Sequence, residues 1–292
     1  MTDQISLPRA IDIACEQFGD SRMEYCHIGL AGETPEGAVI SGSVLDASAL
    51  EAVTRELVQL RPDIEWDMTA VTVLRSQPAH LAAVFTNMTG FFREPSWLAE
   101  QQSQVLNGLL LEILKEEGRW AFVRLNDGYL GWVYQTYLGA ADQVQDATHI
   151  VGVPVSYLHA TPSEAAPLAG RVFAGTAVRA TVHHDGWAEL HLTGGLCGYV
   201  PATDLRDPAE NLPEDALRTR LVSDAQALIG VPYLWGGVTA QGIDCSGFAQ
   251  LMHKLAGVAI PRDADQQFAA GEPVEPPFQT GDLLYFGGSG GH

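Results

Sequence analysis

The chain has 292 residues and a formal net charge of −20, because 36 Asp and Glu residues outnumber 16 Lys and Arg residues. Nucleic acids and anionic polymers reward basic side chains, so this balance argues against them as main partners and favours small substrates that carry an amine. Hydrophobic residues make up 46% of the sequence, which indicates a folded protein with substantial cores rather than a disordered chain.

Several locations and kinds of site are disfavoured. No apolar run reaches the roughly 18 residues of a membrane span, and residues 1–14 lack the basic and apolar segments of a signal peptide, so a cytoplasmic protein is expected. Four scattered cysteines predict neither a disulfide framework nor a Cys-x-x-Cys metal site. A Cys15–Cys26 disulfide would be disfavoured in a reducing compartment.

The first 73 residues predict a small α/β unit, in which no catalytic pattern is evident. Asp46 is the expected N-cap of its second helix. Hydrophobic spacing and turn residues predict helices at 10–18 and 47–60 and strands at 24–30, 38–45 and 68–74.

The middle of the chain contains a repeat. Residues 118–133 align without gaps to residues 185–200, at an offset of 67 that pairs Trp120 with Trp187. Each copy has the pattern of a strand, a tight turn with glycine and a returning strand, with an earlier strand before it. Short strands repeated in this way predict two small β-barrels.

The repeated pattern resembles bacterial SH3 (SH3b) domains, because each copy carries a tryptophan followed by a hairpin that ends in Gly-Trp-Val or Gly-Tyr-Val. The resemblance covers residues 76–140 and 148–206. Trp120 and Trp187 are expected to pack inside these domains. The Pro-rich stretch at 207–213 is typical of a linker.

A cysteine in the last segment, residues 214–292, stands at the start of an expected helix. Phe248, Leu251 and Leu255 fall on one helical face, which places Cys245 near the helix N-terminus. Free N–H groups and the helix dipole favour an anion there, and a thiolate is such an anion. We therefore interpret Cys245 as a nucleophile.

A nucleophilic thiol needs a base, usually histidine. His253 is excluded, because it lies further along the same helix, about 12 Å away at the helical rise. His292 is the better candidate, since it follows an expected strand at 281–286 and a glycine-rich turn. A further helix is expected at 214–229.

Five motifs of this segment occur in the order seen in NlpC/P60 cysteine peptidases. They are Pro232-Tyr233-x-Trp235-Gly236-Gly237, Asp244-Cys245-Ser246-Gly247, Pro261-Arg262, Gly281-Asp282-Leu283-x-x-Phe286 and a final histidine. The resemblance implies a papain-like α+β domain that needs no metal or cofactor and cleaves peptides derived from the bacterial cell wall. It also implies that Cys245 is the nucleophile, that His292 is the base, and that Tyr233 helps to bind the oxyanion.

The whole multidomain α+β architecture resembles γ-D-glutamyl-L-diamino acid endopeptidases of the YkfC type. That resemblance implies that the first SH3b domain limits the site to murein peptides with a free N-terminal L-Ala. Candidate partners for the amine are Glu94, Tyr129 and Asp263. The alternative roles are a loop Glu in solvent, a hairpin-packing Tyr and an Asp paired with Arg262.

The roles of the two residues next to Cys245 can be read in more than one way. Asp244 either binds substrate or caps the helix, and Ser246 is expected to contact the substrate. The family pattern continues beyond the catalytic histidine with strands that supply a third polar residue, whereas this sequence ends at His292. We therefore expect an incomplete catalytic domain, from a fragment or a truncated gene product.

The leading hypothesis is a cytoplasmic cysteine peptidase in peptidoglycan recycling. It cuts the bond between γ-D-Glu and the diamino acid of small murein peptides. The alternatives are an exported murein hydrolase anchored by its SH3b domains and an inactive binding protein. A related acyltransferase or amidase is a further alternative, against which the SH3b pair argues. Neither nucleic acid nor membrane is expected as a partner.

Overall fold

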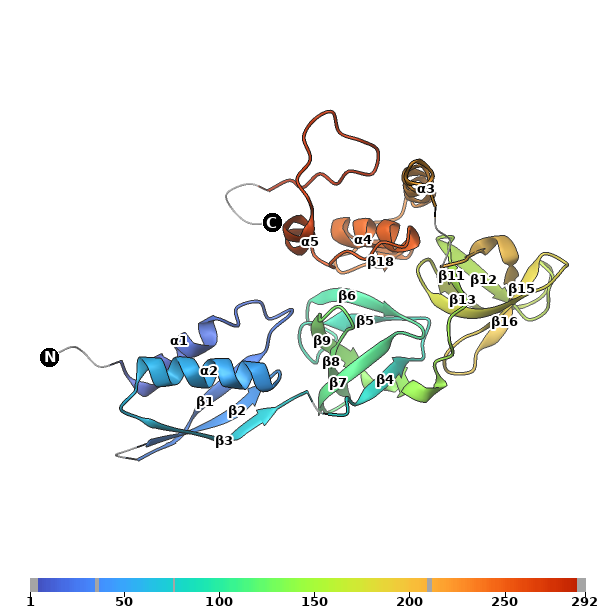
Figure 1. Cartoon of the computed structure of the whole chain (residues 1–292). Helices are drawn as coiled ribbons and strands as arrows, with labels where there is room; N and C mark the ends of the chain where they lie inside the picture. Colours follow the sequence, from blue (N-terminus) through green and yellow to red (C-terminus); the bar gives the residue numbers. More distant parts are fainter. Residues whose placement is uncertain (1–4, 35–36, 76, 209–211, 288–292) are drawn as a thin grey trace. The chain divides into compact units, whose positions relative to one another are not determined.

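The computed structural model describes residues 5–34, 37–75, 77–208 and 212–287 (Figure 1). The chain forms two compact units. The first comprises Met1–His80, Glu112–Glu117 and Ala121–Leu130, and the second comprises Leu81–Leu111, Gly118–Trp120 and Gly131–His292.

The N-terminal part of the first unit combines a three-stranded sheet with two helices. The strand order is β1-β2-β3, with β1 antiparallel and β3 parallel to β2, so that α2 is the crossover of a βαβ unit. Asp46 accepts a hydrogen bond of 3.0 Å from the backbone N–H of Ala49 and caps α2, as predicted. The elements are α1 (Leu7–Glu16), β1 (Cys26–Glu33), β2 (Gly37–Val44), α2 (Ala47–Leu60) and β3 (Glu65–Val73).

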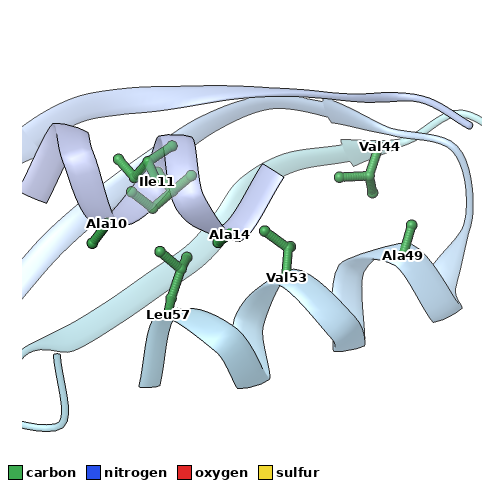
Figure 2. Close-up of a cluster of buried hydrophobic side chains, with 8 residues drawn as sticks. Ala10, Ile11, Ala14, Val44, Ala49, Val53 and Leu57 are labelled. Carbon is green, nitrogen blue, oxygen red and sulfur yellow. The ribbon is translucent and has the colours of Figure 1, made fainter. Parts of the chain in front are cut away.

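Small and branched side chains form the core of this part. Figure 2 shows Ala10 and Ala14 of α1 beside Val53 and Leu57 of α2, with Val44 contributed by the sheet. All five side chains are buried. The small residues on α1 let the two helices approach closely over the sheet.

The predicted repeat occupies residues 81–206. Parts of β7, β8 and β9 belong to the first unit, and the remaining strands belong to the second. The first copy contains β4 (Leu81–Val84), β5 (Met88–Phe92), β6 (Gln101–Leu106), β7 (Leu110–Glu117), β8 (Trp120–Arg124), β9 (Leu130–Tyr134) and β10 (Leu138–Ala140). The second copy contains β11 (His149–Val151), β12 (Val155–His159), β13 (Leu168–Phe173), β14 (Ala177–Val182), β15 (Trp187–His191), β16 (Cys197–Pro201) and β17 (Leu205–Arg206).

The offset of 67 residues found in the sequence holds in the structure. β5, β6, β8 and β9 have the same bounds as β12, β13, β15 and β16 once 67 is added to each residue number. The pairing also repeats, since Phe92 faces Trp132 where β5 meets β9, and His159 faces Tyr199 where β12 meets β16. The predicted repeat of two small β-domains is therefore confirmed.

The last segment combines helices with a short hairpin. Its elements are α3 (Glu214–Ala227), β18 (Val238–Thr239), β19 (Gly242–Ile243), α4 (Cys245–Leu255) and α5 (Ala264–Ala270). Helix α3 begins at the predicted residue and ends two residues earlier than expected. Strand β19 leads directly into α4, and this connection places the candidate nucleophile, Cys245, at the start of the helix.

The predicted strand at 281–286 is wrong, because the described residues there form a turn and an irregular segment. Asp282 explains the difference. Its carboxylate accepts a hydrogen bond of 2.7 Å from the backbone N–H of Gln279 and lies 3.4 Å from Arg218 Nη1 of α3. The contacts of the Asp282 side chain with this turn and with α3 thus hold the segment, instead of the hydrogen bonds of a strand ladder.

Candidate active site

Cys245 is the first residue of α4, as the sequence predicts, and its side chain is exposed. Asp244 is the N-cap, and its carboxylate accepts a hydrogen bond of 2.6 Å from the backbone N–H of Gly247. The other N–H groups at this helix start lack partners within the helix. The thiol therefore stands beside donors that favour negative charge.

Packing on the opposite side of α4 fixes the direction of the cysteine. Leu251, Met252 and Leu255 are buried in one cluster with Ile243 and Leu228, which confirms the helical face read from the sequence. The helix therefore anchors one side in a core while its first residue stays accessible.

His253 lies in the last turn of α4. Its Nδ1 is 2.8 Å from the carbonyl oxygen of Ala249, to which it donates. This placement agrees with its exclusion as the base. The preferred base, His292, lies outside the described residues.

Two glycines bring the loop before β18 against the start of α4. A Cβ on Gly247 would lie 2.3 Å from the carbonyl oxygen of Gly237, and a Cβ on Gly237 would lie 2.3 Å from the carbonyl oxygen of Gly242. Atoms cannot approach so closely, so both positions require glycine. The glycines of the two sequence motifs thus permit two close backbone contacts, one between Gly247 and Gly237 and one between Gly237 and Gly242.

Tyr233 lies beside the short hairpin that leads into α4. It forms an isolated parallel bridge with Ile243, and the backbone N–H of Leu234 donates to the carbonyl of Ile243 at 3.2 Å. The side chain is 65% exposed. Partial burial, followed by the negative charges of Cys245 and Asp244, raises the pKa of Tyr233, which keeps its hydroxyl protonated as a hydrogen-bond donor.

Asp244 forms a buried ion pair with Arg262, whose side chain is 3% exposed. Arg262 Nη2 donates to Oδ2 at 2.6 Å, and Nη1 donates to Oδ1 at 3.1 Å. The same carboxylate caps α4. Of the two roles considered for Asp244, substrate binding and helix capping, the structure therefore shows capping. From the sequence, Arg262 is named in the Pro261-Arg262 motif and as a possible partner of the adjacent Asp263, but not as the partner of Asp244.

Ser246 is buried and forms hydrogen bonds within the protein. Arg262 Nη1 donates to its Oγ at 2.9 Å, and its backbone carbonyl accepts from Gln267 Nε2 at 3.0 Å. Tyr285 donates in turn to Gln267 Oε1 at 3.4 Å. The residue after Cys245 is therefore held through both its side chain and its carbonyl group.

The three amine-site candidates have different surroundings. Asp263 is half-buried at the N-cap position of α5, where its side chain makes no capping hydrogen bond. Glu94 is exposed in the loop between β5 and β6. Tyr129 belongs to the first unit, and its side chain is buried. Asp263 and Glu94 share the second unit with Cys245.

Strand β6 supplies contacts that sequence reasoning missed. Ser103 Oγ accepts from Arg262 Nε at 2.9 Å, and Gln104 Oε1 accepts from the backbone N–H of Val238 at 3.0 Å. Just before the strand, Glu100 Oε1 accepts from Trp235 Nε1 at 2.9 Å. These partners are separated by 134 to 159 residues, so no local pattern could reveal them.

The described side chains contain no group of three or more His, Cys, Asp and Glu residues that could hold a metal ion. Within the same residues, no helix has the length and apolar character needed to cross a bilayer.

Comparison with known proteins gives consistent similarities. The model of the NlpC/P60 family matches residues 230–292, and that of the bacterial dipeptidyl-peptidase Sh3 domain matches residues 91–138. Dipeptidyl-peptidase 6 of Lysinibacillus sphaericus is 30% identical over 223 residues, which cover 71% of this chain and 82% of that protein.

Two further similarities extend over most of the chain. Gamma-D-glutamyl-L-lysine dipeptidyl-peptidase of Bacillus subtilis is 26% identical over 200 residues; the match covers 63% of this chain and 64% of that relative, less than two thirds of its length. A crystal structure of an NlpC/P60 family protein from Bacillus cereus has a TM-score of 0.60 at 20% identity. It covers 69% of this chain and 81% of the other, and shows that the fold is shared.

Proposed function

Because this chain belongs to the NlpC/P60 family, we propose that it is a cysteine peptidase whose nucleophile is Cys245. The observation that carries the proposal is the position of an exposed thiol at the first residue of α4. A thiolate there benefits from the helix dipole and from backbone N–H groups that have no partner within the helix. The opposite face of the helix is anchored in a core, which supports a fixed direction of attack.

In the proposed reaction, the Cys245 thiolate attacks the carbonyl carbon of the scissile amide. The negative charge that develops on the carbonyl oxygen is stabilised by the backbone N–H of Cys245 and by the Tyr233 hydroxyl. The tetrahedral intermediate collapses to a thioester as the leaving amine takes a proton from His292. A water molecule, deprotonated by the same imidazole, then hydrolyses the thioester and restores the thiol.

The proposed substrate is a small wall-derived peptide with a free N-terminal L-Ala, cut between γ-D-Glu and the diamino acid. The name of the Bacillus subtilis relative supports this choice, since it specifies a γ-D-glutamyl-L-lysine bond and release of a dipeptide. The charge of −20 also suits a peptide that carries amines. Glu94 and Asp263, which share the second unit with Cys245, remain the proposed partners of the alanine amine, whereas Tyr129 is buried in the first unit, as in its alternative packing role.

We also propose that the peptidase acts in the cytoplasm, on peptides released during peptidoglycan recycling. An acidic protein is repelled by anionic wall polymers and is better suited to small peptides in solution. Cell fractionation would check the location. Recovery of the protein with the wall, together with cleavage of intact murein, would favour the exported alternative.

Peptide cleavage by the purified full chain tests the proposed function. The substrate is L-Ala-γ-D-Glu-L-Lys, and mass spectrometry follows release of L-Ala-γ-D-Glu. The matched control is the same peptide with its alanine amine acetylated, which removes the charge that acidic partners would recognise. Dipeptide release from the free peptide alone is expected. Equal turnover of both peptides would contradict the amine site, and release from neither would contradict the activity.

A further inference from the structure

One guanidinium contacts both neighbours of Cys245 in the chain. Arg262 forms a bidentate pair with Asp244, the residue before the cysteine. It also donates a hydrogen bond of 2.9 Å to the Oγ of Ser246, the residue after it. Arg262 precedes α5 and lies 16 to 18 residues from these partners, so the contacts connect two separate segments.

A further contact of this guanidinium comes from the first SH3-type domain. Arg262 Nε donates to the Oγ of Ser103 at 2.9 Å. Ser103 is buried in β6, where it pairs in register with Phe91 of β5. A planar guanidinium with donors on all three nitrogens is fixed in orientation when each nitrogen has a partner. Strand β6 therefore helps to set the plane of the Arg262 side chain.

We propose that Arg262 is a positioning residue for the nucleophile, and that Ser103 makes strand β6 part of the same device. The inference rests on the proposed role of Cys245 and extends it. Arg262 touches neither the reacting atoms nor the substrate in this account. It acts through the two residues that determine where the cysteine and its backbone N–H point.

Charge gives a first physical reason why Arg262 should affect the thiolate of Cys245. Asp244 is a buried carboxylate next to a residue that must carry negative charge as a thiolate. Two adjacent negative charges disfavour each other, and Arg262 compensates the fixed one. Among the described residues, Asp244, Arg262 and Tyr233 are charged or titratable groups at this turn, and Arg262 is the cation paired with the buried carboxylate.

Geometry gives a second reason. The cap formed by Asp244 fixes the first turn of α4, and Ser246 lies in that turn. If the guanidinium is lost, the buried carboxylate lacks its charged partner and the turn rearranges to reach water. A displacement of about 1 Å at a reacting group can cost about 100-fold in rate. Loss of Arg262 should thus lower kcat much more than it raises KM.

The test compares Arg262→Lys, Arg262→Met and Ser103→Ala in the full chain. Arg206→Met is the matched control for Arg262, because Arg206 forms a bidentate pair with Asp224, the buried residue of α3. Ser156→Ala is the control for Ser103, since Ser156 is buried and donates to Asp204 at 2.6 Å. Each variant is first checked for native circular dichroism.

Two measurements are made on each folded variant. The first is the rate at which iodoacetamide alkylates Cys245 at pH 7, read by mass spectrometry of its peptide. Exposed Cys197 serves as an internal reference. The second is the pair of values kcat and KM for the tripeptide. Alkylation needs no substrate, so it reports on the thiol even if the proposed substrate is wrong.

Arg262→Met is expected to slow alkylation of Cys245 about tenfold and to lower kcat about 100-fold with little change in KM. Alkylation of Arg262→Lys should be faster than that of Arg262→Met, because lysine keeps the positive charge. Its kcat should stay low, because the bidentate guanidinium is lost. Ser103→Ala should lower kcat about tenfold. Both controls should match the wild type.

Wild-type alkylation and kcat in both Arg262→Lys and Ser103→Ala would overturn the proposal. This outcome can be read even if Arg262→Met fails to fold. If kcat falls in Arg262→Lys while Ser103→Ala behaves like the wild type, the role of Arg262 is supported and the part assigned to β6 is overturned. Full peptide cleavage by Cys245→Ala would instead contradict the proposed function itself, whatever the alkylation rates.

Discussion

The Oδ1 atom of Asp244 accepts hydrogen bonds from the backbone N–H of Gly247 at 2.6 Å and from Arg262 at 3.1 Å. Its Oδ2 atom accepts from the backbone N–H of Gly236 at 2.8 Å and from Arg262 at 2.6 Å. One buried carboxylate thus connects the loop before β18, the first turn of α4 and the guanidinium. The residue next to Cys245 is therefore held from three segments of the candidate site.

Substitution of Asp244 separates capping from charge. Asp244→Asn keeps a good N-cap but leaves Arg262 buried without its ion pair, and should lower the free energy of unfolding by about 3 kcal/mol. Asp244→Ala removes the cap as well and should cost about 1 kcal/mol more. Urea unfolding of the two variants provides the measurement. Equal stability of Asp244→Asn and wild type would contradict the ion-pair account.

Gly247 tests the close contact between the loop and the helix. Alanine usually stabilises a helix by about 1 kcal/mol over glycine. Here its Cβ would lie 2.3 Å from the Gly237 carbonyl oxygen, so Gly247→Ala should destabilise the protein by about 3 kcal/mol. Gly29→Ala is the control, because a Cβ there meets nothing within 4 Å. Thermal unfolding should show a large loss for the first variant and a change within about 0.5 kcal/mol for the second.

Asp46 gives a pH-dependent prediction in the first unit. Burial acts to raise its pKa, but hydrogen bonds from Ser48 and Ala49 and the charge of Arg75 outweigh it, so the pKa of Asp46 is lowered overall. A lowered pKa stabilises the fold above the unfolded value of about 3.9, and this stability is lost as pH falls through the folded value.

Two substitutions separate the cap at Asp46 from its charge. Asp46→Ala should lower the free energy of unfolding by about 1 kcal/mol at pH 7, while Asp46→Asn should lower it by less because asparagine also caps. Denaturant titrations from pH 7 to pH 3 supply the measurement. The difference between wild type and Asp46→Asn should shrink below about pH 4, and a constant difference would be inconsistent with the role of the charge.

Cys15 and Cys26 are unlinked thiols whose sulfur atoms lie 3.2 Å apart. The hydrogen bond between them lowers the pKa of Cys15 and raises that of Cys26. Under oxidised glutathione, the Cys15 thiolate should attack the reagent disulfide. Cys26 should then displace the second glutathione and leave a Cys15–Cys26 disulfide.

Peptide mapping without reductant distinguishes the two kinds of product. Exposed Cys197 is expected to remain as a mixed disulfide, whereas Cys15 should be found joined to Cys26. Closing this short loop should stabilise the fold by about 3 kcal/mol. Persistent glutathione on Cys15 would show that the two sulfur atoms do not meet in solution.

Local signals in the sequence predicted the elements on which the candidate site is built. Helix α2 has the predicted bounds because Asp46 marks its start and apolar spacing marks its length. Helix α4 carries the predicted buried face, and its first residue is Cys245. The SH3-type domains could be found because a 67-residue repeat is visible without knowledge of contacts.

Contacts between distant segments could not be predicted in the same way. The pairing of Arg262 with Asp244 and Ser103 depends on how the chain folds back, whereas proximity in sequence favours Asp263 as its partner. The expected strand at 281–286 failed for a related reason. An apolar run indicates a strand only if a neighbour pairs with it, and here Asp282 directs the backbone into a turn held by α3.

The central claim, that Cys245 is the nucleophile, is tested most directly by the rate of dipeptide release in Cys245→Ala. Cys197→Ala is the matched control, because Cys197 is also an exposed free thiol but lies in β16. Cys245→Ala should reduce release of L-Ala-γ-D-Glu from the tripeptide by about a thousandfold or more, while Cys197→Ala should match the wild type. Undiminished release by Cys245→Ala would contradict the account.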